Sequence, residues 1–264
     1  MRASRLLLPT LLVAALPASA QVMLPGDPHA DDPGGIVADP CPTHPKAADG
    51  SSRDLTKLRM FTRDFGQLCR YRAENEAARA QPVRVVFLGD SITDGWIGAD
   101  PDLFTGGVVD RGIGGQTTPQ MLVRFRQDVV ALNPKAVHIM AGTNDIAGNT
   151  GASTMATVQG NIQSMAELAR AHGIKVILAS IPPAAAFPWS PGKDPAPQIA
   201  EMNAWLARYA AAEGFTYVDY HRVLATPDGA MKPGLARDGV HPTPAGYAAM
   251  RPLALAAIRR TLGR

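Results

Sequence analysis

Cysteine is scarce in this sequence, with only Cys41 and Cys69 among 264 residues. The two are not clustered with histidines at a spacing used for metal ligation, and the chain contains no His-Glu-x-x-His motif, so we expect no metal site. Charge of one sign is also lacking, because 26 Lys and Arg residues nearly balance 23 Asp and Glu residues. The basic residues are scattered without interleaved aromatic residues, and this pattern argues against a nucleic-acid partner.

Long apolar runs are also lacking beyond the start of the chain. A membrane-spanning helix requires about 18 unbroken apolar residues, and no run after residue 20 reaches that length. At the start, Arg2 and Arg5 precede an apolar stretch over residues 6–16, which is followed by the small residues Ala-Ser-Ala at 18–20. This pattern predicts a cleaved signal peptide over residues 1–20 and therefore a periplasmic or secreted protein, with an uncleaved anchor as the alternative.

The region between the signal peptide and the main domain is predicted in two parts. Residues 21–52 are rich in Pro, Asp, Gly and Ala without apolar periodicity, which is typical of a flexible leader. In an exported protein the two cysteines favour a Cys41–Cys69 disulfide, which would join the leader to the domain and contribute roughly 3–4 kcal/mol. Residues 53–80 are predicted to form an added helix with an apolar stripe packed on the domain. The stripe consists of Leu55, Leu58, Phe61, Phe65 and Leu68.

From residue 81 to 264, short apolar runs alternate with amphipathic segments. The runs predict five strands, over residues 83–88, 107–110, 136–141, 175–180 and 216–219. The other segments predict helices over residues 119–132, 153–172, 198–213 and 243–262. This alternation predicts a single α/β domain over residues 53–264, built as a three-layer α/β/α sandwich with a five-stranded parallel sheet.

A proline-rich loop follows the fourth predicted strand. Residues 181–197 contain six prolines around Phe187 and Trp189. Because the loop starts at the carboxyl end of a strand, it should overhang the edge of the sheet where open α/β proteins bind ligands. We therefore place Phe187 and Trp189 on a candidate substrate rim, with an ordinary solvent loop as the alternative. Trp96 is a third candidate for this rim, although it could equally belong to the core.

The residue types needed for nucleophilic catalysis occur at the ends of predicted elements. Ser91 follows the first strand, at the carboxyl edge of the sheet. Near the end of the chain, His241 is a candidate base for the serine hydroxyl, and Asp238 is the candidate carboxylate that orients the imidazole. Gly115 after the second strand and Asn144 after the third could donate hydrogen bonds to a developing oxyanion, together with the Ser91 amide.

Taken in order, these segments resemble the sequence blocks of the SGNH (GDSL-type) esterase and lipase family, which is named for its Ser, Gly, Asn and His. The blocks in this chain read Gly-Asp-Ser-Ile-Thr, Gly-Ile-Gly-Gly-Gln-Thr-Thr, Gly-Thr-Asn-Asp and Asp-Gly-Val-His-Pro. The resemblance implies a flavodoxin-like fold, no metal and no cofactor, and an oxyanion hole formed by Ser91, Gly115 and Asn144. Many relatives of the platelet-activating-factor acetylhydrolase type carry Asn where this chain has Asp110, so we assign no close subfamily.

The residues and the resemblance together predict a serine-dependent carboxylester hydrolase that acts through an acyl-enzyme. Predicted export and the resemblance to carbohydrate-esterase and acetylhydrolase-like members favour a short acyl group, such as acetate, on a carbohydrate or small ester. The alternatives are a lysophospholipase or thioesterase for longer acyl chains, a sugar O-acetyltransferase, and a non-catalytic glycan-binding module. The sequence leaves the natural substrate and the oligomeric state open.

Overall fold

The computed structural model describes residue 36 and residues 63–263. The predicted signal peptide (residues 1–20) lies outside the described residues, as do Cys41 and all of the predicted leader (residues 21–52) except residue 36. The export signal, the leader and the Cys41–Cys69 disulfide therefore stay predictions.

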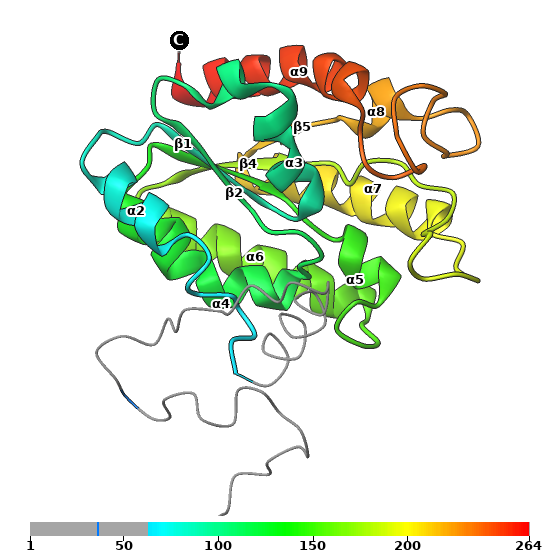
Figure 1. The fold of residues 1–264 in the computed structure, drawn as a ribbon, viewed down its shortest axis with the longest axis horizontal. Coiled ribbons are helices and arrows are strands. Elements are labelled where there is room, and N and C mark those ends of the chain that lie inside the picture. The colour runs from blue at the N-terminus through cyan, green and yellow to red at the C-terminus, as the bar shows by residue number, and fades with distance from the viewer. Residues whose placement is uncertain (1–35, 37–62, 264) are drawn as a thin grey trace, which may run out of the picture. The chain divides into compact units, whose positions relative to one another are not determined.

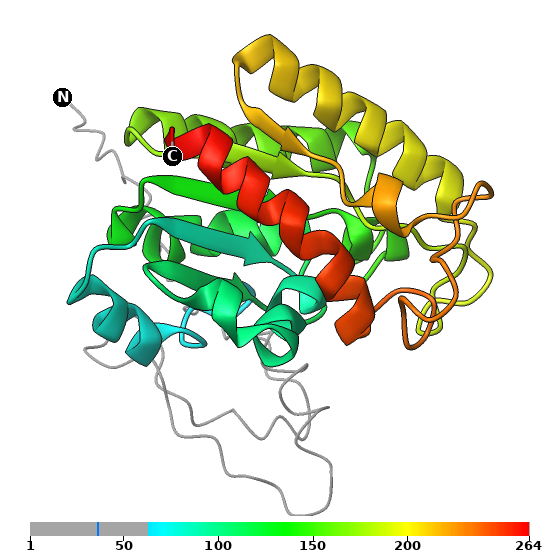
Figure 2. The same ribbon diagram turned by 90° about the horizontal axis from the view of Figure 1, so that it is seen from above.

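Five parallel strands form one sheet. They are β1 (Val85–Gly89), β2 (Val108–Gly112), β3 (Ala136–Met140), β4 (Lys175–Ala179) and β5 (Thr216–Val218). Their order across the sheet is β2-β1-β3-β4-β5 (Figures 1 and 2). The central strands β1 and β3 are buried at every position, because helices cover both faces of the sheet. The predicted α/β class with a five-stranded parallel sheet is confirmed.

The helices form the two outer layers. They are α2 (Arg72–Arg79), α3 (Ser91–Ala99), α4 (Thr118–Asp128), α5 (Thr143–Ala147), α6 (Met155–Ala171), α7 (Ala196–Glu213), α8 (His221–Leu224) and α9 (Pro244–Leu262). In Figure 1, α3 and α9 lie above the sheet and α4 and α6 lie below it, while α7 packs against β4 and β5. Over residues 63–263, no helix has the length and apolar character needed to cross a membrane.

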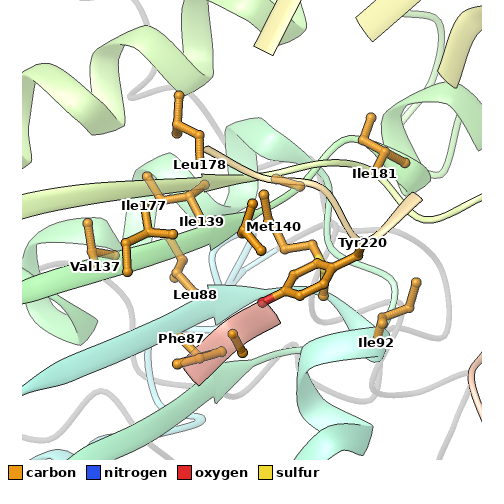
Figure 3. Packing of buried hydrophobic residues seen from close by; sticks show 14 of the residues in the cluster. Phe87, Leu88, Ile92, Val137, Ile139, Met140, Ile177, Leu178, Ile181 and Tyr220 are labelled. Carbon is orange, nitrogen blue, oxygen red and sulfur yellow. The ribbon is translucent and has the colours of Figure 1, made fainter. Parts of the chain in front are cut away.

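The sheet and its helices enclose one apolar core, in which side chains from β1, β3 and β4 meet (Figure 3). Trp96 belongs to this core. Its ring is completely buried and packs edge-on against Phe87 and Tyr220, at centroid distances of 5.8 and 5.6 Å. Of the two alternatives for Trp96, the core is therefore confirmed and the substrate rim is wrong, because its position on α3 points the indole inward while the neighbouring Ile97 is exposed.

Of the predicted helix over residues 53–80, the described part is helical only over residues 72–79, and the prediction is wrong for residues 63–71. Residues 63–71 form turns, and the chain becomes helical only at α2. Phe65 and Leu68, which helical spacing placed on a buried stripe, are exposed. Their carbonyl oxygens accept hydrogen bonds from glutamine side chains of α4, and Gln67 has a positive φ of 53°. Contacts with the main domain thus replace helical hydrogen bonds in this segment.

Candidate active site

The turn between β1 and α3 places Ser91 at the carboxyl edge of the sheet. Ser91 is the first residue of α3, and Asp90 before it caps the helix. Asp90 Oδ1 accepts a hydrogen bond of 2.9 Å from the Ile92 amide, which satisfies a free N–H of the first turn. The last strand residue must be glycine, because a Cβ on Gly89 would lie 2.0 Å from Thr93 Oγ1. The chain therefore turns sharply and leaves the serine half-buried.

Asp238 and His241 lie on a second turn, between α8 and α9. An antiparallel bridge between Ala236 and Pro242 closes this turn. Asp238 Oδ1 accepts hydrogen bonds from the amides of Val240 (3.1 Å) and His241 (2.8 Å). One carboxylate oxygen thus organises the turn, which leaves the other free to face the imidazole ring.

The two turns meet in a hydrogen-bonded chain of serine, histidine and aspartate. Ser91 Oγ lies 2.9 Å from His241 Nε2, although the two residues are 150 positions apart. On the other side of the ring, His241 Nδ1 lies 2.7 Å from Asp238 Oδ2. A nucleophile, a base and an orienting acid require contacts of this length. The fold thus brings together the three residues that the sequence analysis grouped.

The surroundings of Asp238 favour an ionised carboxylate beside the ring. Desolvation raises the pKa of Asp238, but hydrogen bonds from the His241 amide and ring and from the Val240 amide outweigh it, so the pKa lies below its ordinary value. A carboxylate that stays ionised can stabilise a positive charge on the neighbouring imidazole.

The backbone amides of Gly115 and Ser91 are the two predicted donors to an oxyanion. Gly115 lies in the loop between β2 and α4 and has a φ of +79°, which glycine adopts without steric cost. Its neighbour Gly114 approaches the serine, since a Cβ there would lie 3.8 Å from Ser91 Cβ. We observe no hydrogen bond from the Gly115 or Ser91 amide to any other described residue.

Asn144 lies on α5, which follows β3 at the same edge of the sheet. Its Nδ2 donates to the carbonyl oxygen of Gln116 (3.0 Å) and to Asp90 Oδ2 (3.3 Å). Its Oδ1 accepts a hydrogen bond of 2.9 Å from Asn149 Nδ2. The side chain is buried, so these contacts join it to the serine turn and to the loop that carries Gly115.

Asp90 is a buried carboxyl group within this network. Burial raises the pKa of Asp90 to about 6, against the lowering effects of the Ile92 amide and of His241. Both of its oxygens are occupied, one by the Ile92 amide and the other by Asn144. Asp90 is buried and therefore organises the serine turn from within the protein.

Trp189 stands beside the site on the proline-rich loop. Its side chain is 40% exposed, and the centroid of its ring lies 5.6 Å from that of His241. Phe187 packs against Trp189 at a centroid distance of 5.2 Å, but it is buried. Of the two rim residues predicted on this loop, only Trp189 reaches the surface, because Phe187 folds inward and supports the indole.

Two polar residues that hold the site together, Arg124 and Asn149, were not predicted from the sequence. Arg124 is fully buried and donates to Gln116 Oε1 (2.6 Å) and to the Gly89 carbonyl oxygen (3.0 Å). Asn149 donates to Asn144 and to the loop that precedes α4. An arginine in an amphipathic helix and an asparagine in a glycine-rich turn have the pattern of surface residues, so no sequence signal distinguished them.

A parallel α/β sheet that carries a hydrogen-bonded serine, histidine and aspartate at its carboxyl edge is typical of hydrolases that act on acyl groups. The model of the GDSL-like Lipase/Acylhydrolase family matches residues 87–249, well over half of the chain. The chain belongs to this family and is an ester hydrolase. The resemblance drawn from the four sequence blocks is confirmed.

Two solved structures are similar to this chain over nearly their whole length. A GDSL-like lipase from Bacteroides thetaiotaomicron is 49% identical with a TM-score of 0.71, and the match covers 74% of this chain and 98% of that one. A candidate acylhydrolase from Bacteroides fragilis is 47% identical with a TM-score of 0.72, and the match covers 76% and 99%. The similarity therefore extends to both sequence and fold.

Two further matches are more limited. The uncharacterized lipoprotein YqeF of Bacillus subtilis is 40% identical over 79 residues, and the match spans 29% of this chain and only 32% of that protein. An acetylxylan esterase from Geobacillus stearothermophilus is 21% identical with a TM-score of 0.54, covering 67% of this chain and 94% of that one. The second match shows a shared fold alone.

Proposed function

We propose that the protein is a serine-dependent carboxylester hydrolase that releases a short acyl group, such as acetate, from a carbohydrate or small ester. The single observation that carries this proposal is the chain of hydrogen bonds from Ser91 Oγ through His241 to Asp238, at 2.9 and 2.7 Å. A serine hydroxyl is a weak nucleophile until an adjacent base takes its proton, and this geometry supplies that base.

In the first half of the reaction, Ser91 Oγ attacks the carbonyl carbon of the ester while His241 Nε2 takes the hydroxyl proton. Asp238 stabilises the positive charge on the ring. The carbonyl oxygen becomes an oxyanion, which the amides of Ser91 and Gly115 stabilise. Asn144 adds a third donor when the N–H in its longer contact, 3.3 Å to Asp90 Oδ2, turns to the oxyanion. The tetrahedral species then collapses, the bond to the alcohol breaks, and the alcohol leaves with the proton from His241.

The second half of the reaction replaces the alcohol by water. His241 takes a proton from a water molecule, whose oxygen attacks the acyl carbon attached to Ser91. Collapse of the second tetrahedral species breaks the bond to Ser91 Oγ, releases the acid and returns the proton to the serine. Every proton moves through one imidazole, and the cycle consumes only ester and water, so we propose that it needs no cofactor.

The exposed ring of Trp189 supports a carbohydrate ester as the substrate. A sugar ring presents C–H groups on one face, and a flat aromatic ring is a suitable surface for that face. Trp189 lies next to His241, where the alcohol part of an ester would be held. The acetylxylan esterase from Geobacillus stearothermophilus, which has a similar fold, acts on such an ester by its name.

Export is part of the same proposal. The basic start, apolar stretch and small-residue site over residues 1–20 favour a signal peptide. The Bacillus subtilis relative is a lipoprotein, which agrees with a protein that leaves the cytoplasm. We therefore propose a periplasmic or secreted enzyme whose substrate lies outside the cytoplasm.

The test is hydrolysis of 4-nitrophenyl acetate by the purified protein and two serine variants. Ser91→Ala should lower kcat at least about 10³-fold, because it removes the nucleophile. Ser153→Ala is the matched control at an exposed serine outside the site and should keep wild-type turnover. A fluorophosphonate probe should label the wild type and the control, but not Ser91→Ala.

Several outcomes would contradict the proposal. Wild-type turnover in Ser91→Ala would refute serine catalysis, and the absence of both turnover and labelling in the wild type would favour a non-catalytic glycan-binding module. A rate that rises from acetyl to decanoyl esters would indicate a lysophospholipase or thioesterase. Faster transfer of acetate to a sugar than to water would indicate an O-acetyltransferase.

A further inference from the structure

Asn149 occupies a position from which one side chain reaches three parts of the site. It follows Gly148, whose φ of +78° ends α5 and reverses the chain. The Asn149 amide then donates to the carbonyl oxygen of Asn144, at 3.0 Å. This turn brings the Asn149 side chain back beside the first residues of α5.

The hydrogen bonds of the Asn149 side chain determine which way its amide group faces. Its Nδ2 donates to the carbonyl oxygen of Gly115 (3.0 Å), and its Oδ1 accepts from Trp189 Nε1 (3.0 Å). A carbonyl oxygen can only accept and an indole N–H can only donate, so a rotation of the amide by 180° would break both contacts. The orientation of Asn149 is therefore fixed from both sides.

Asn149 in turn determines the orientation of Asn144. The second donor contact of Asn149 Nδ2 is to Asn144 Oδ1, at 2.9 Å. With Oδ1 held in this way, Asn144 must present its Nδ2 to the Gln116 carbonyl oxygen and to Asp90 Oδ2. The reversed orientation would set two amide groups donor to donor and place an oxygen against two oxygens. One N–H of Asn144 thus faces the serine turn, and the other faces the loop that carries Gly115.

We infer that Asn149 is a positioning residue for the oxyanion hole, and that Trp189 fixes the orientation of the Asn149 amide group through its indole N–H. The inference rests on the proposed function, because it assumes that Asn144 and Gly115 stabilise the oxyanion. Asn149 restrains both of these residues without reaching the ester itself. Trp189 then has two roles, since its ring faces the substrate while its N–H begins the relay that orients the donors.

The test compares steady-state kinetics on 4-nitrophenyl acetate for three variants. Asn149→Ala and Asn149→Asp remove the donated hydrogen bonds, and kcat should fall by about 10²-fold while KM changes by less than about threefold. Trp189→Phe keeps an aromatic ring but lacks the N–H, and kcat should fall by about tenfold. Asn161→Asp is the matched control, because Asn161 donates to a threonine outside the relay and its loss should leave kcat within about threefold of wild type.

A double-mutant cycle separates positioning from a general structural role. If Asn149 acts through Asn144, Asn149→Ala should cost at least about fivefold less in kcat when Asn144→Ala is already present. Full additivity of the two changes would overturn the inference, and so would a kcat for both Asn149 variants equal to that of Asn161→Asp. Inactivity of Ser91→Ala in the same assay would leave the proposed function standing in either case.

If the Asn149 variants do not fold, their kinetics cannot test the inference. In that case Trp189→Phe provides the test. Trp189 lies at the partly exposed rim, and thermal unfolding of this variant should match that of the wild type. A reduced kcat with an unchanged melting temperature would support the relay, whereas an unchanged kcat would overturn it.

Discussion

Arg124 and Gly89 are joined by a hydrogen bond of 3.0 Å that runs from the guanidinium group to the last carbonyl oxygen of β1. The same guanidinium donates to Gln116 Oε1 (2.6 Å) and to Asp128 Oδ2 (3.0 Å), and the whole side chain is buried. Burial lowers the pKa of Arg124, while Asp128 opposes this change. One buried cation thus connects the end of the serine strand with the loop that carries Gly115.

Arg124→Met should destabilise the protein by about 3–5 kcal/mol, because it leaves the Asp128 carboxylate buried without its ion pair. The free energy of unfolding can be measured by urea denaturation at pH 7. Arg126→Met, at an exposed position of the same helix, is the control and should change this free energy by less than about 0.5 kcal/mol. Similar urea midpoints for the two variants would contradict the prediction.

Gly89→Ala should reduce both stability and activity. A Cβ there would lie 2.0 Å from Thr93 Oγ1 and 2.9 Å from the Met140 carbonyl oxygen, and overpacking of this kind costs about 1–3 kcal/mol. Thermal unfolding and ester hydrolysis check the two effects. Gly98→Ala in α3 is the matched control, because a Cβ there meets no atom within 4 Å. If Gly89→Ala melts and turns over as Gly98→Ala does, the steric argument fails.

Asp110 makes stability depend on pH. Burial raises the pKa of Asp110 to about 7, against the hydrogen bond from the Gly112 amide, while nearby Asp94 raises it further. Among the described residues, its Oδ2 has no hydrogen-bond partner. An unfolded aspartate titrates near pH 3.9, so between about pH 4 and pH 7 the folded state holds a proton that the unfolded state releases. The free energy of unfolding therefore decreases as pH rises through this window.

Asp110→Asn removes this titration and keeps an oxygen for the Gly112 amide. The variant should be more stable than the wild type by at least about 1 kcal/mol at pH 8, and the difference should shrink toward zero near pH 4. Urea denaturation at pH 4.5, 6 and 8 measures it. A difference that is constant with pH, or largest in acid, would show that Asp110 is not the titrating group.

Asp238→Asn should lower kcat by roughly 10³–10⁴-fold, because an amide neither holds the imidazole in the required tautomer nor stabilises its positive charge. The measurement is ester hydrolysis at pH 7.5, with thermal unfolding to check that the fold is retained. Asp228→Asn removes a charge from an exposed loop outside the site and should keep wild-type kcat. Equal turnover of the two variants would remove Asp238 from the mechanism.

The strands were predictable because a sheet covered on both faces requires runs of apolar residues. The predicted strands over residues 136–141 and 175–180 match β3 and β4 to within one residue. The helix observed in place of the one predicted over residues 119–132 is shorter than predicted, because α4 ends at Asp128 and is followed by a 3-10 turn over Val130–Leu132. The apolar pattern continues through this turn, so periodicity does not reveal where the helix ends.

The errors of the sequence analysis have a common physical origin. Apolar spacing shows which side chains avoid water, but not which neighbour will cover them. Trp96 was a candidate for both the rim and the core because it follows the serine, and its position on the buried face of α3 places its ring in the core. Phe65 and Leu68 have helical spacing, yet hydrogen bonds from α4 hold their backbone in turns. Both outcomes depend on tertiary contacts that no local pattern contains.

The three residues of the proposed catalytic group were predictable for a different reason. Ser91 lies in one short sequence motif, and Asp238 and His241 lie in another. The proposed chemistry requires all three side chains together, so finding one motif predicts that the other lies near it in the fold. Asn149 and Arg124 have no such motif. Their importance follows from hydrogen bonds with residues 5 to 40 positions away, and those pairings exist only after the chain has folded.

The bridge between Ala236 and Pro242 places Asp238 and His241 on the same short loop. If that loop detaches from the body of the protein, both side chains leave Ser91 in one event. We therefore expect heat inactivation to proceed in a single step, without a half-active form in which only the carboxylate has been lost.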